Sequence, residues 1–100
     1  MSNKFTDLKG STSEYKAKLW LKKMYPTNDV AETNHFSELD RKGYDLIVHN
    51  NGNVRLVAQV KSSVDGAVAY MQHDLFDARV SIIVVQDGQS PYFYHKGKVL

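Results

Sequence analysis

The sequence contains no cysteine, which excludes disulfide bonds, thiolate zinc sites and a cysteine nucleophile. No apolar run approaches the ~20 residues that a membrane-spanning helix needs. The first ten residues, MSNKFTDLKG, also lack the apolar stretch of a signal peptide. We therefore expect a cytoplasmic protein that does not associate with a membrane.

The chain also has little length and little excess charge. Its 100 residues suit one domain spanning residues 1–100. A core of this size is thin, so association with a partner or a second copy would add stability. The formal net charge of +2 permits an anionic partner without requiring one.

Two stretches have the apolar spacing of helices. In residues 14–25, Ala17, Trp20, Leu21 and Met24 recur at helical intervals. The serines and threonine at 11–13 offer N-caps, and Pro26 should end this helix. A second helix is predicted over residues 64–78, with Leu75 and Ala78 on its apolar face.

The remaining segments predict β-strands. They cover residues 30–36, 44–49, 54–61 and 80–85, with a short additional strand at 92–95. The sequence Asn50-Asn51-Gly52-Asn53 predicts a hairpin, because Asn and Gly tolerate the positive φ that such turns require. The polar first strand should lie at a sheet edge. The resulting order, αβββαβ, predicts an α/β fold with a mixed central sheet flanked by helices.

The chemically informative stretch is GYDLIVHNNGNVRLVAQVKSS, residues 43–63. Gln59 and Lys61 are two positions apart on one strand, so their side chains point to the same face. The hairpin places the start of its first strand beside the end of its second. Asp45 should therefore approach Gln59 and Lys61 in space.

These groups suit the hydrolysis of phosphate esters. Mg²⁺ prefers hard oxygen ligands, which the Asp45 carboxylate, the Gln59 side-chain carbonyl and the Val60 backbone carbonyl can supply. Such a metal polarises a phosphoryl oxygen. Lys61 could orient the attacking water or stabilise the charge that develops on the phosphate.

An Asp, a hairpin and then (D/E/Q)-x-Lys is the signature of the PD-(D/E)XK nuclease superfamily, and Gln59-Val60-Lys61 resembles its Gln-x-Lys members. The surrounding pattern is similar to intron-encoded homing endonucleases and more loosely to archaeal Holliday-junction resolvases. The resemblance covers residues 9–85. It rests on Lys9-Gly10, Ser13-Glu14, Gly43-Tyr44-Asp45-Leu46 and Gln59-Val60-Lys61-Ser62-Ser63.

This resemblance implies a restriction-endonuclease-like fold and a Mg²⁺- or Mn²⁺-dependent endonuclease that cleaves DNA. Asp45 would bind the metal, Lys61 would be the catalytic lysine, and Glu14 would match a helix-borne acid that joins the metal shell. Gln59 stands where most members have an acid, which removes one negative charge from the metal site. Tyr44 stands where the family motif has proline.

Several assignments have competing explanations. Glu14 fits a capping box with the preceding Ser and Thr residues as well as it fits a metal site. Glu32, Glu38 and Asp40 are alternative acids. Four lysines lie on the first predicted helix, namely Lys16, Lys18, Lys22 and Lys23. They could contact phosphates, although exposure of this helix face to solvent explains them more simply. The four histidines are scattered without metal-ligand spacing.

Contacts to the nucleic acid are expected around the motif. Arg41 and Lys42 directly precede its first acid, and Ser62 and Ser63 follow its lysine, so these four residues are candidate nucleic-acid contacts. One site cuts one strand, so double-strand cleavage would favour a homodimer or a larger homo-oligomer.

Three other functions remain open from the residues. The protein could be a junction-selective resolvase, or it could cleave RNA. It could also be a non-catalytic module that binds nucleic acid or protein, because the Gln59 substitution and the modest charge are compatible with a loss of turnover.

Overall fold

The computed structural model describes residues 4–33 and 44–98 and shows an α/β architecture. Two helices and a five-stranded mixed sheet make up this part of the chain, as the sequence predicted. The elements in chain order are α1 (Lys4–Met24), β1 (Asp29–Glu32), β2 (Leu46–Asn50), β3 (Asn53–Lys61), α3 (Val64–Met71), β4 (Ser81–Val84) and β5 (Tyr92–His95).

The strands lie in the sheet in the order in which they occur along the chain, from β1 to β5. Strands β1, β2 and β3 form an antiparallel meander. Helix α3 then provides the crossover that lets β4 run parallel to β3, and β5 returns antiparallel to β4. Strand β1 is at one edge, as expected from its polar residues.

The turn between β2 and β3 confirms the hairpin predicted from Asn and Gly. Asn51 has a φ of 51° and Gly52 a φ of 84°, both in the left-handed region that these two residue types tolerate. The pairing of Leu46 with Ala58 sets the register, with an irregularity between Val48 and His49. This register decides which residues of β3 lie beside the start of β2.

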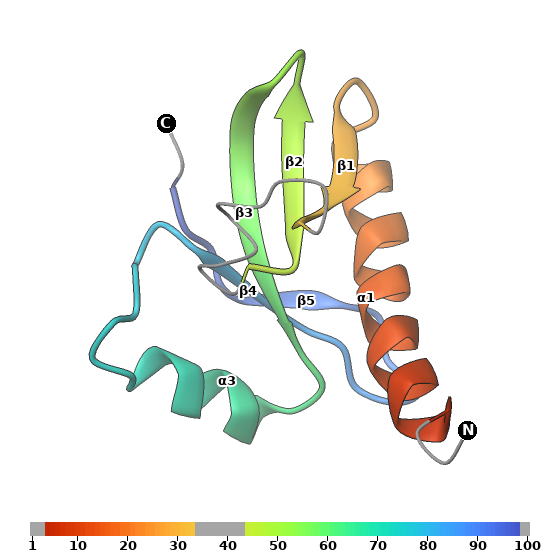
Figure 1. Ribbon diagram of the computed structural model, residues 1–100, viewed down its shortest axis with the longest axis vertical. Coiled ribbons are helices and arrows are strands. Elements are labelled where there is room, and N and C mark those ends of the chain that lie inside the picture. Colours follow the sequence, from red (N-terminus) through yellow and green to blue (C-terminus); the bar gives the residue numbers. More distant parts are fainter. Residues whose placement is uncertain (1–3, 34–43, 99–100) are drawn as a thin grey trace.

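The two helices cover opposite faces of the sheet (Figure 1). Ala17 and Leu21 of α1 pack in one buried cluster together with alternate residues of β3, namely Leu56, Ala58 and Val60. On the other face, Ala67 of α3 packs on Ile82 and Val84 of β4. Val57 belongs to that second face, so the predicted alternation along β3 is confirmed.

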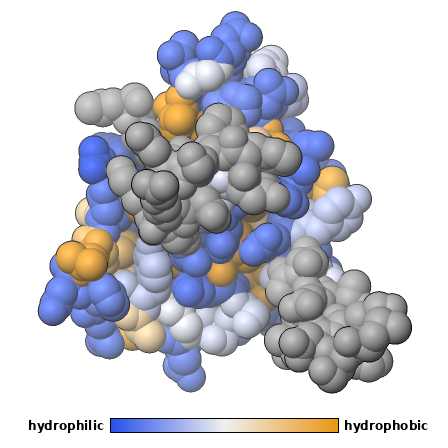
Figure 2. All heavy atoms as spheres, viewed as in Figure 1, coloured by the Kyte–Doolittle hydropathy of each residue, from blue (hydrophilic) through white to orange (hydrophobic). Residues whose placement is uncertain are grey.

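In the view of Figure 2, the surface outside the grey atoms is mainly hydrophilic, with hydrophobic residues scattered across it. Among the residues whose burial is described, Leu75 is the most exposed large apolar side chain, at 85%. Within residues 4–33 and 44–98, neither helix combines the length and the hydropathy that crossing a bilayer requires.

The predicted start of the first helix is wrong, because α1 begins at Lys4 and not near Glu14. Residues 11–13 lie inside the helix and cannot be its N-cap. The segment before Glu14 contains no proline, and Gly10 costs only about 1 kcal/mol relative to alanine in a helix interior. The capping-box explanation of Glu14 is therefore wrong, since Glu14 lies well beyond the first turn.

Helix α3 is shorter than predicted and ends at Met71. Side chains compete for the backbone beyond that point: the Leu75 amide donates to His73 Nδ1 (3.1 Å) and the Arg79 amide donates to Asp77 Oδ1 (2.9 Å). The prediction that Leu75 and Ala78 continue the apolar face is wrong, because both are exposed.

Candidate functional site

At the end of the pairing between β2 and β3, the side chain of Asp45 takes the place of a backbone hydrogen-bonding group. Its backbone amide donates to the Ala58 carbonyl at 2.9 Å, and its carboxylate Oδ2 accepts from the Val60 amide at 2.8 Å. The carboxylate thus occupies the place of a strand carbonyl at the end of β3. The predicted proximity of Asp45 to the Gln59–Lys61 end of β3 is confirmed, because the hairpin register brings these segments together.

The end of β1 holds the backbone that carries Asp45. The Thr33 amide donates to the Asp45 carbonyl at 3.2 Å, and the buried Thr33 hydroxyl donates to the Tyr44 carbonyl. Sequence reasoning did not single out Thr33. These bonds fix Asp45 from the side opposite β3, which limits the positions that its carboxylate can adopt.

The carboxamide of Gln59 is the most unusual polar group of the site. Its Oε1 is buried and has no hydrogen-bond partner among the residues that the structure describes. Leaving a buried acceptor without a partner costs about 1–3 kcal/mol. Continuing the β2–β3 register places Gln59 opposite Asp45, so this open acceptor and a carboxylate share one end of the sheet.

Lys61 extends from the end of β3 to the face that α3 covers. Its Nζ lies 5.1 Å from the centre of the Tyr70 ring, a cation–π contact. Tyr70 is half-buried and packs against the apolar clusters of this face. Sequence reasoning missed Tyr70, although its helical spacing from the buried Ala67 is a signal that it faces the sheet.

Glu14 enters the site from α1. Burial raises the pKa of the Glu14 carboxyl above its ordinary value, and the negative charges of Asp45 and then Glu32 raise it further. Glu14 on α1, Glu32 at the end of β1 and Asp45 directly before β2 therefore share one electrostatic environment. Such a cluster of like charges favours either a proton or a cation among them.

The negative charge of Asp45 also affects Tyr70, on the face of the sheet that α3 covers. The pKa of Tyr70 is raised mainly by burial and further by Tyr44, Asp45 and Asp77. Asp45 thus lies within electrostatic range of Glu14 on α1 and of Tyr70 on α3.

The oxygen groups of the site are candidate donors for a divalent metal. Within the described residues, no three side chains of His, Asp or Glu form a ready metal-binding group. The donors expected at this site are instead two carboxylates, from Asp45 and Glu14, with neutral oxygens from Gln59 and Val60. Mg²⁺ accepts such mixed oxygen sets and keeps several waters. The Gln59 oxygen, buried and unbonded among the described residues, is the kind of acceptor that a cation would satisfy.

The predicted nucleic-acid contacts have different outcomes. Arg41 and Lys42 lie outside the described residues, as do the alternative acids Glu38 and Asp40. Ser63 is the N-cap of α3, and its hydroxyl accepts from the Gly66 amide at 3.0 Å. Ser62 is exposed in the bend after Lys61. Both serines remain candidate contacts by position only.

Comparison of the chain with protein-family models, with curated proteins and with solved structures finds no significant match in any of the three. The functional argument therefore depends on the residues of the site.

Proposed function

We propose that the protein is a metal-dependent endonuclease that hydrolyses phosphodiester bonds in DNA, with Asp45, Gln59, Lys61 and Glu14 as its catalytic and metal-binding side chains. The observation that carries this proposal is the buried Oε1 of Gln59, which has no partner among the described residues and lies at the same sheet end as the Asp45 carboxylate. A structural role explains a hydrogen-bonded amide. Among the described residues, this buried acceptor has no donor that would give it such a role.

Asp45, Glu14, Gln59 Oε1 and the Val60 carbonyl would hold the ion. The amide of Val60 points toward Asp45, and a strand residue directs its N–H and C=O to the same neighbour, so its carbonyl faces the same side. When bound, Mg²⁺ or Mn²⁺ supplies positive charge that polarises a phosphoryl oxygen. The raised pKa of Glu14 supports this assignment, because a cation relieves the repulsion among the acids.

Lys61 supplies the second positive charge. Its ammonium can donate hydrogen bonds to the attacking water or to the phosphate oxygen on which charge develops. The Tyr70 ring restricts where that ammonium lies without neutralising it. This differs from a lysine held by a carboxylate, whose charge would already be compensated.

The topology supports the finer part of the fold proposal, a restriction-endonuclease-like arrangement. A helix precedes an antiparallel meander of three strands, and a crossover helix then leads to a strand parallel to the third. This is the αβββαβ order that the resemblance implies. The acid directly before β2 and the Gln-x-Lys at the end of β3 are compatible with this proposal.

Nicking of supercoiled plasmid DNA in the presence of Mg²⁺ or Mn²⁺ tests the proposal. We expect the Asp45→Ala and Lys61→Ala variants to lose cleavage while keeping their circular dichroism spectra. Lys98→Ala is the matched control, because Lys98 is exposed, carries the same charge as Lys61 and has no role in the proposed site. Equal cleavage by the wild type and by Lys61→Ala would overturn the proposal.

A panel of substrates separates the related activities. Four-way junctions cleaved in preference to linear duplexes would identify a resolvase, and preferred digestion of RNA would identify an RNA nuclease. Binding without metal-dependent cleavage of any substrate would identify a non-catalytic module, an alternative with which the missing charge at Gln59 is compatible. Linear product from a plasmid would indicate that two copies act together, since one site cuts one strand.

A further inference from the structure

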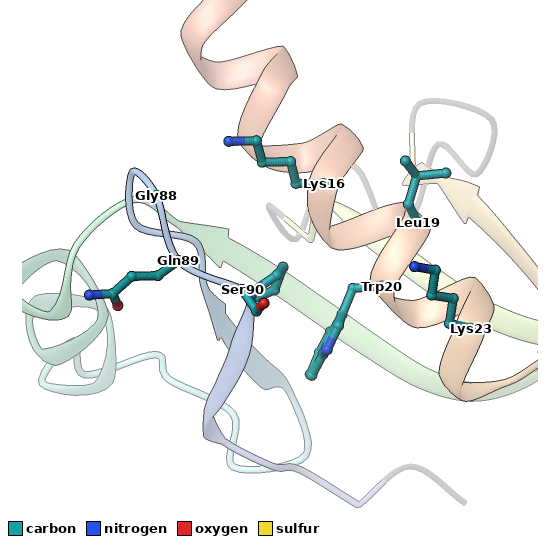
Figure 3. A pocket seen from close by; sticks show the side chains of 8 residues that line it. Lys16, Leu19, Trp20, Lys23, Gly88, Gln89 and Ser90 are labelled. Atoms are coloured by element: carbon teal, nitrogen blue, oxygen red, sulfur yellow. The ribbon is translucent and has the colours of Figure 1, made fainter.

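A groove of about 400 Å³ lies between α1 and the loop that joins β4 to β5. Its lining residues are Lys16, Leu19, Trp20, Lys23, Gly88, Gln89, Ser90 and Pro91. None of the four catalytic candidates lines it. In Figure 3, the Lys16 side chain extends from α1 toward the loop, and the Trp20 ring lies beside Ser90.

The polar groups of this groove favour an anion. Lys16 and Lys23 are seven residues apart, which is two helical turns or about 10 Å along α1. Neither ammonium forms an ion pair within the described part of the chain, and no acid is among the lining residues. Gln89 and Ser90 add an amide and a hydroxyl that can donate hydrogen bonds.

The apolar part of the groove is built around one aromatic ring. Trp20 is half-buried and packs at a tilt against Phe93, with ring centroids 4.9 Å apart. Its remaining surface contributes to the groove together with Leu19 and Pro91. An aromatic surface flanked by two unpaired cations is the combination with which proteins bind single-stranded nucleic acid.

We propose that this groove binds a single-stranded segment of nucleic acid, with one base against Trp20 and neighbouring phosphates at Lys16 and Lys23. The volume suits a ligand of nucleotide size and is too small for a duplex. An acidic peptide would match the lysines but would bring no planar base for the tryptophan.

The groove and the candidate active site adjoin the same end of the sheet. The Lys61 carbonyl accepts from the Val85 amide at 2.9 Å, so the loop that lines the groove leaves the sheet beside Lys61. Glu14 precedes Lys16 by two residues on α1. The inference rests on the proposed function in one respect, which is that the bound segment continues the strand that is cut.

Fluorescence of Trp20 provides the test, since it is the chain's one tryptophan. The wild-type protein in EDTA, which prevents cleavage, is titrated with a short oligothymidylate. We expect saturable quenching that the double variant Lys16→Glu/Lys23→Glu weakens about tenfold or more. Lys18→Glu/Lys22→Glu is the matched control, because it makes the same charge change on α1 outside the groove and should bind within about twofold of the wild type.

Three results would overturn the inference. The first is an equal loss of binding in both double variants, which would indicate non-specific attraction. The second is equal quenching by a duplex of the same sequence. The third is quenching by a polyglutamate peptide with the same dependence on Lys16 and Lys23, which would identify an acidic-peptide site.

Plasmid cleavage, measured separately, distinguishes this inference from the proposed function. Groove-specific quenching without cleavage supports the binding site and overturns the nuclease. Metal-dependent cleavage without any response of Trp20 supports the nuclease and overturns the binding site. A Trp20→Phe variant followed by anisotropy of a labelled oligothymidylate reports binding without the fluorophore and should bind more weakly than wild type.

Discussion

The ammonium of Lys61 lies over the ring of Tyr70, 5.1 Å from its centre, and joins the end of β3 to the crossover helix α3. The ring offers a negative face without a formal charge, so the lysine is positioned and remains a full cation. A carboxylate in the same place would hold Lys61 more tightly but would compensate the charge that a phosphate needs.

Replacing Tyr70 tests this positioning role. Tyr70→Leu keeps an apolar side chain on α3 against the sheet but removes the ring, and a cation–π contact contributes about 0.5–2 kcal/mol. We expect single-turnover cleavage to slow by about 2- to 30-fold, at a rate-energy conversion of about 1.4 kcal/mol per factor of ten. Tyr70→Phe retains the ring and should restore the rate. A Phe variant as slow as the Leu variant would contradict the cation–π explanation.

Gln59 provides a test of metal binding that does not depend on cleavage. Gln59→Leu removes a buried oxygen that has no partner among the described residues, so the metal-free protein should gain up to about 1–3 kcal/mol of unfolding free energy. The same variant should lose the rise in melting temperature that Mg²⁺ or Mn²⁺ gives the wild type. If metal stabilises the Leu variant as much as the wild type, Gln59 is not a ligand.

Replacing Gln59 with glutamate adds the negative charge that most members of the PD-(D/E)XK superfamily carry at this position. Gln59→Glu places another carboxylate near Asp45 and Glu14, which should lower stability without metal through repulsion. The extra negative charge should also strengthen binding of Mg²⁺, measured by isothermal titration calorimetry. Unchanged stability and unchanged metal affinity would show that residue 59 is remote from the acids.

Glu14 predicts a specific pH dependence of stability. Burial, with the charges of Asp45 and Glu32, raises the pKa of Glu14 in the folded protein above its ordinary value of 4.5. The ionised form therefore costs stability at pH values above the folded pKa. As the pH falls through the folded pKa toward 4.5, Glu14 takes up a proton and this cost disappears.

We expect Glu14→Gln to be more stable than the wild type at neutral pH in EDTA, with an advantage that shrinks as the pH falls and vanishes below about 4.5. Urea denaturation over a pH series measures this difference. Mg²⁺ should also reduce the advantage, because a bound cation stabilises the ionised acid. An advantage that grows on acidification would contradict the assigned direction of the pKa shift.

Leu21 and Leu75, one buried and one exposed, test which of the residues predicted to be helical pack in the core. Leu21 of α1 is fully buried in the main core cluster, whereas Leu75 is 85% exposed beyond the end of α3. Leu21→Ala should cost about 2–5 kcal/mol of unfolding free energy, and Leu75→Ala should change it by less than about 0.5 kcal/mol. Chemical denaturation measures both. Similar losses would mean that residues 72–78 pack as the sequence pattern alone suggested.

The strands were more predictable than the helix ends. Alternation and β-branched residues located β2, β3 and β4, and the Asn-Gly turn fixed which ends of β2 and β3 meet. The helix ends depended on contacts that periodicity does not contain. The residues before Glu14 are polar enough to resemble a loop, and His73 and Asp77 end α3 through side-chain bonds to backbone amides.

The candidate site was predictable to the extent that it follows from the hairpin. The approach of Asp45 to Gln59–Lys61 needed only the turn and the pairing register. Tyr70 and Thr33 could not be found in this way, because they reach the site through the crossover helix and the end of the edge strand. The roles of Arg41 and Lys42 remain predictions.

The position of β4 in the sheet has a consequence for synthesis of the protein. This strand is buried between β3 and β5 but is translated after both the meander and α3. Until it leaves the ribosome, β3 presents an open row of backbone donors and acceptors beside apolar side chains, which other nascent chains can pair with. We expect a chain that stops before Ser81 to aggregate more readily than the full chain, because β3 then keeps its open edge.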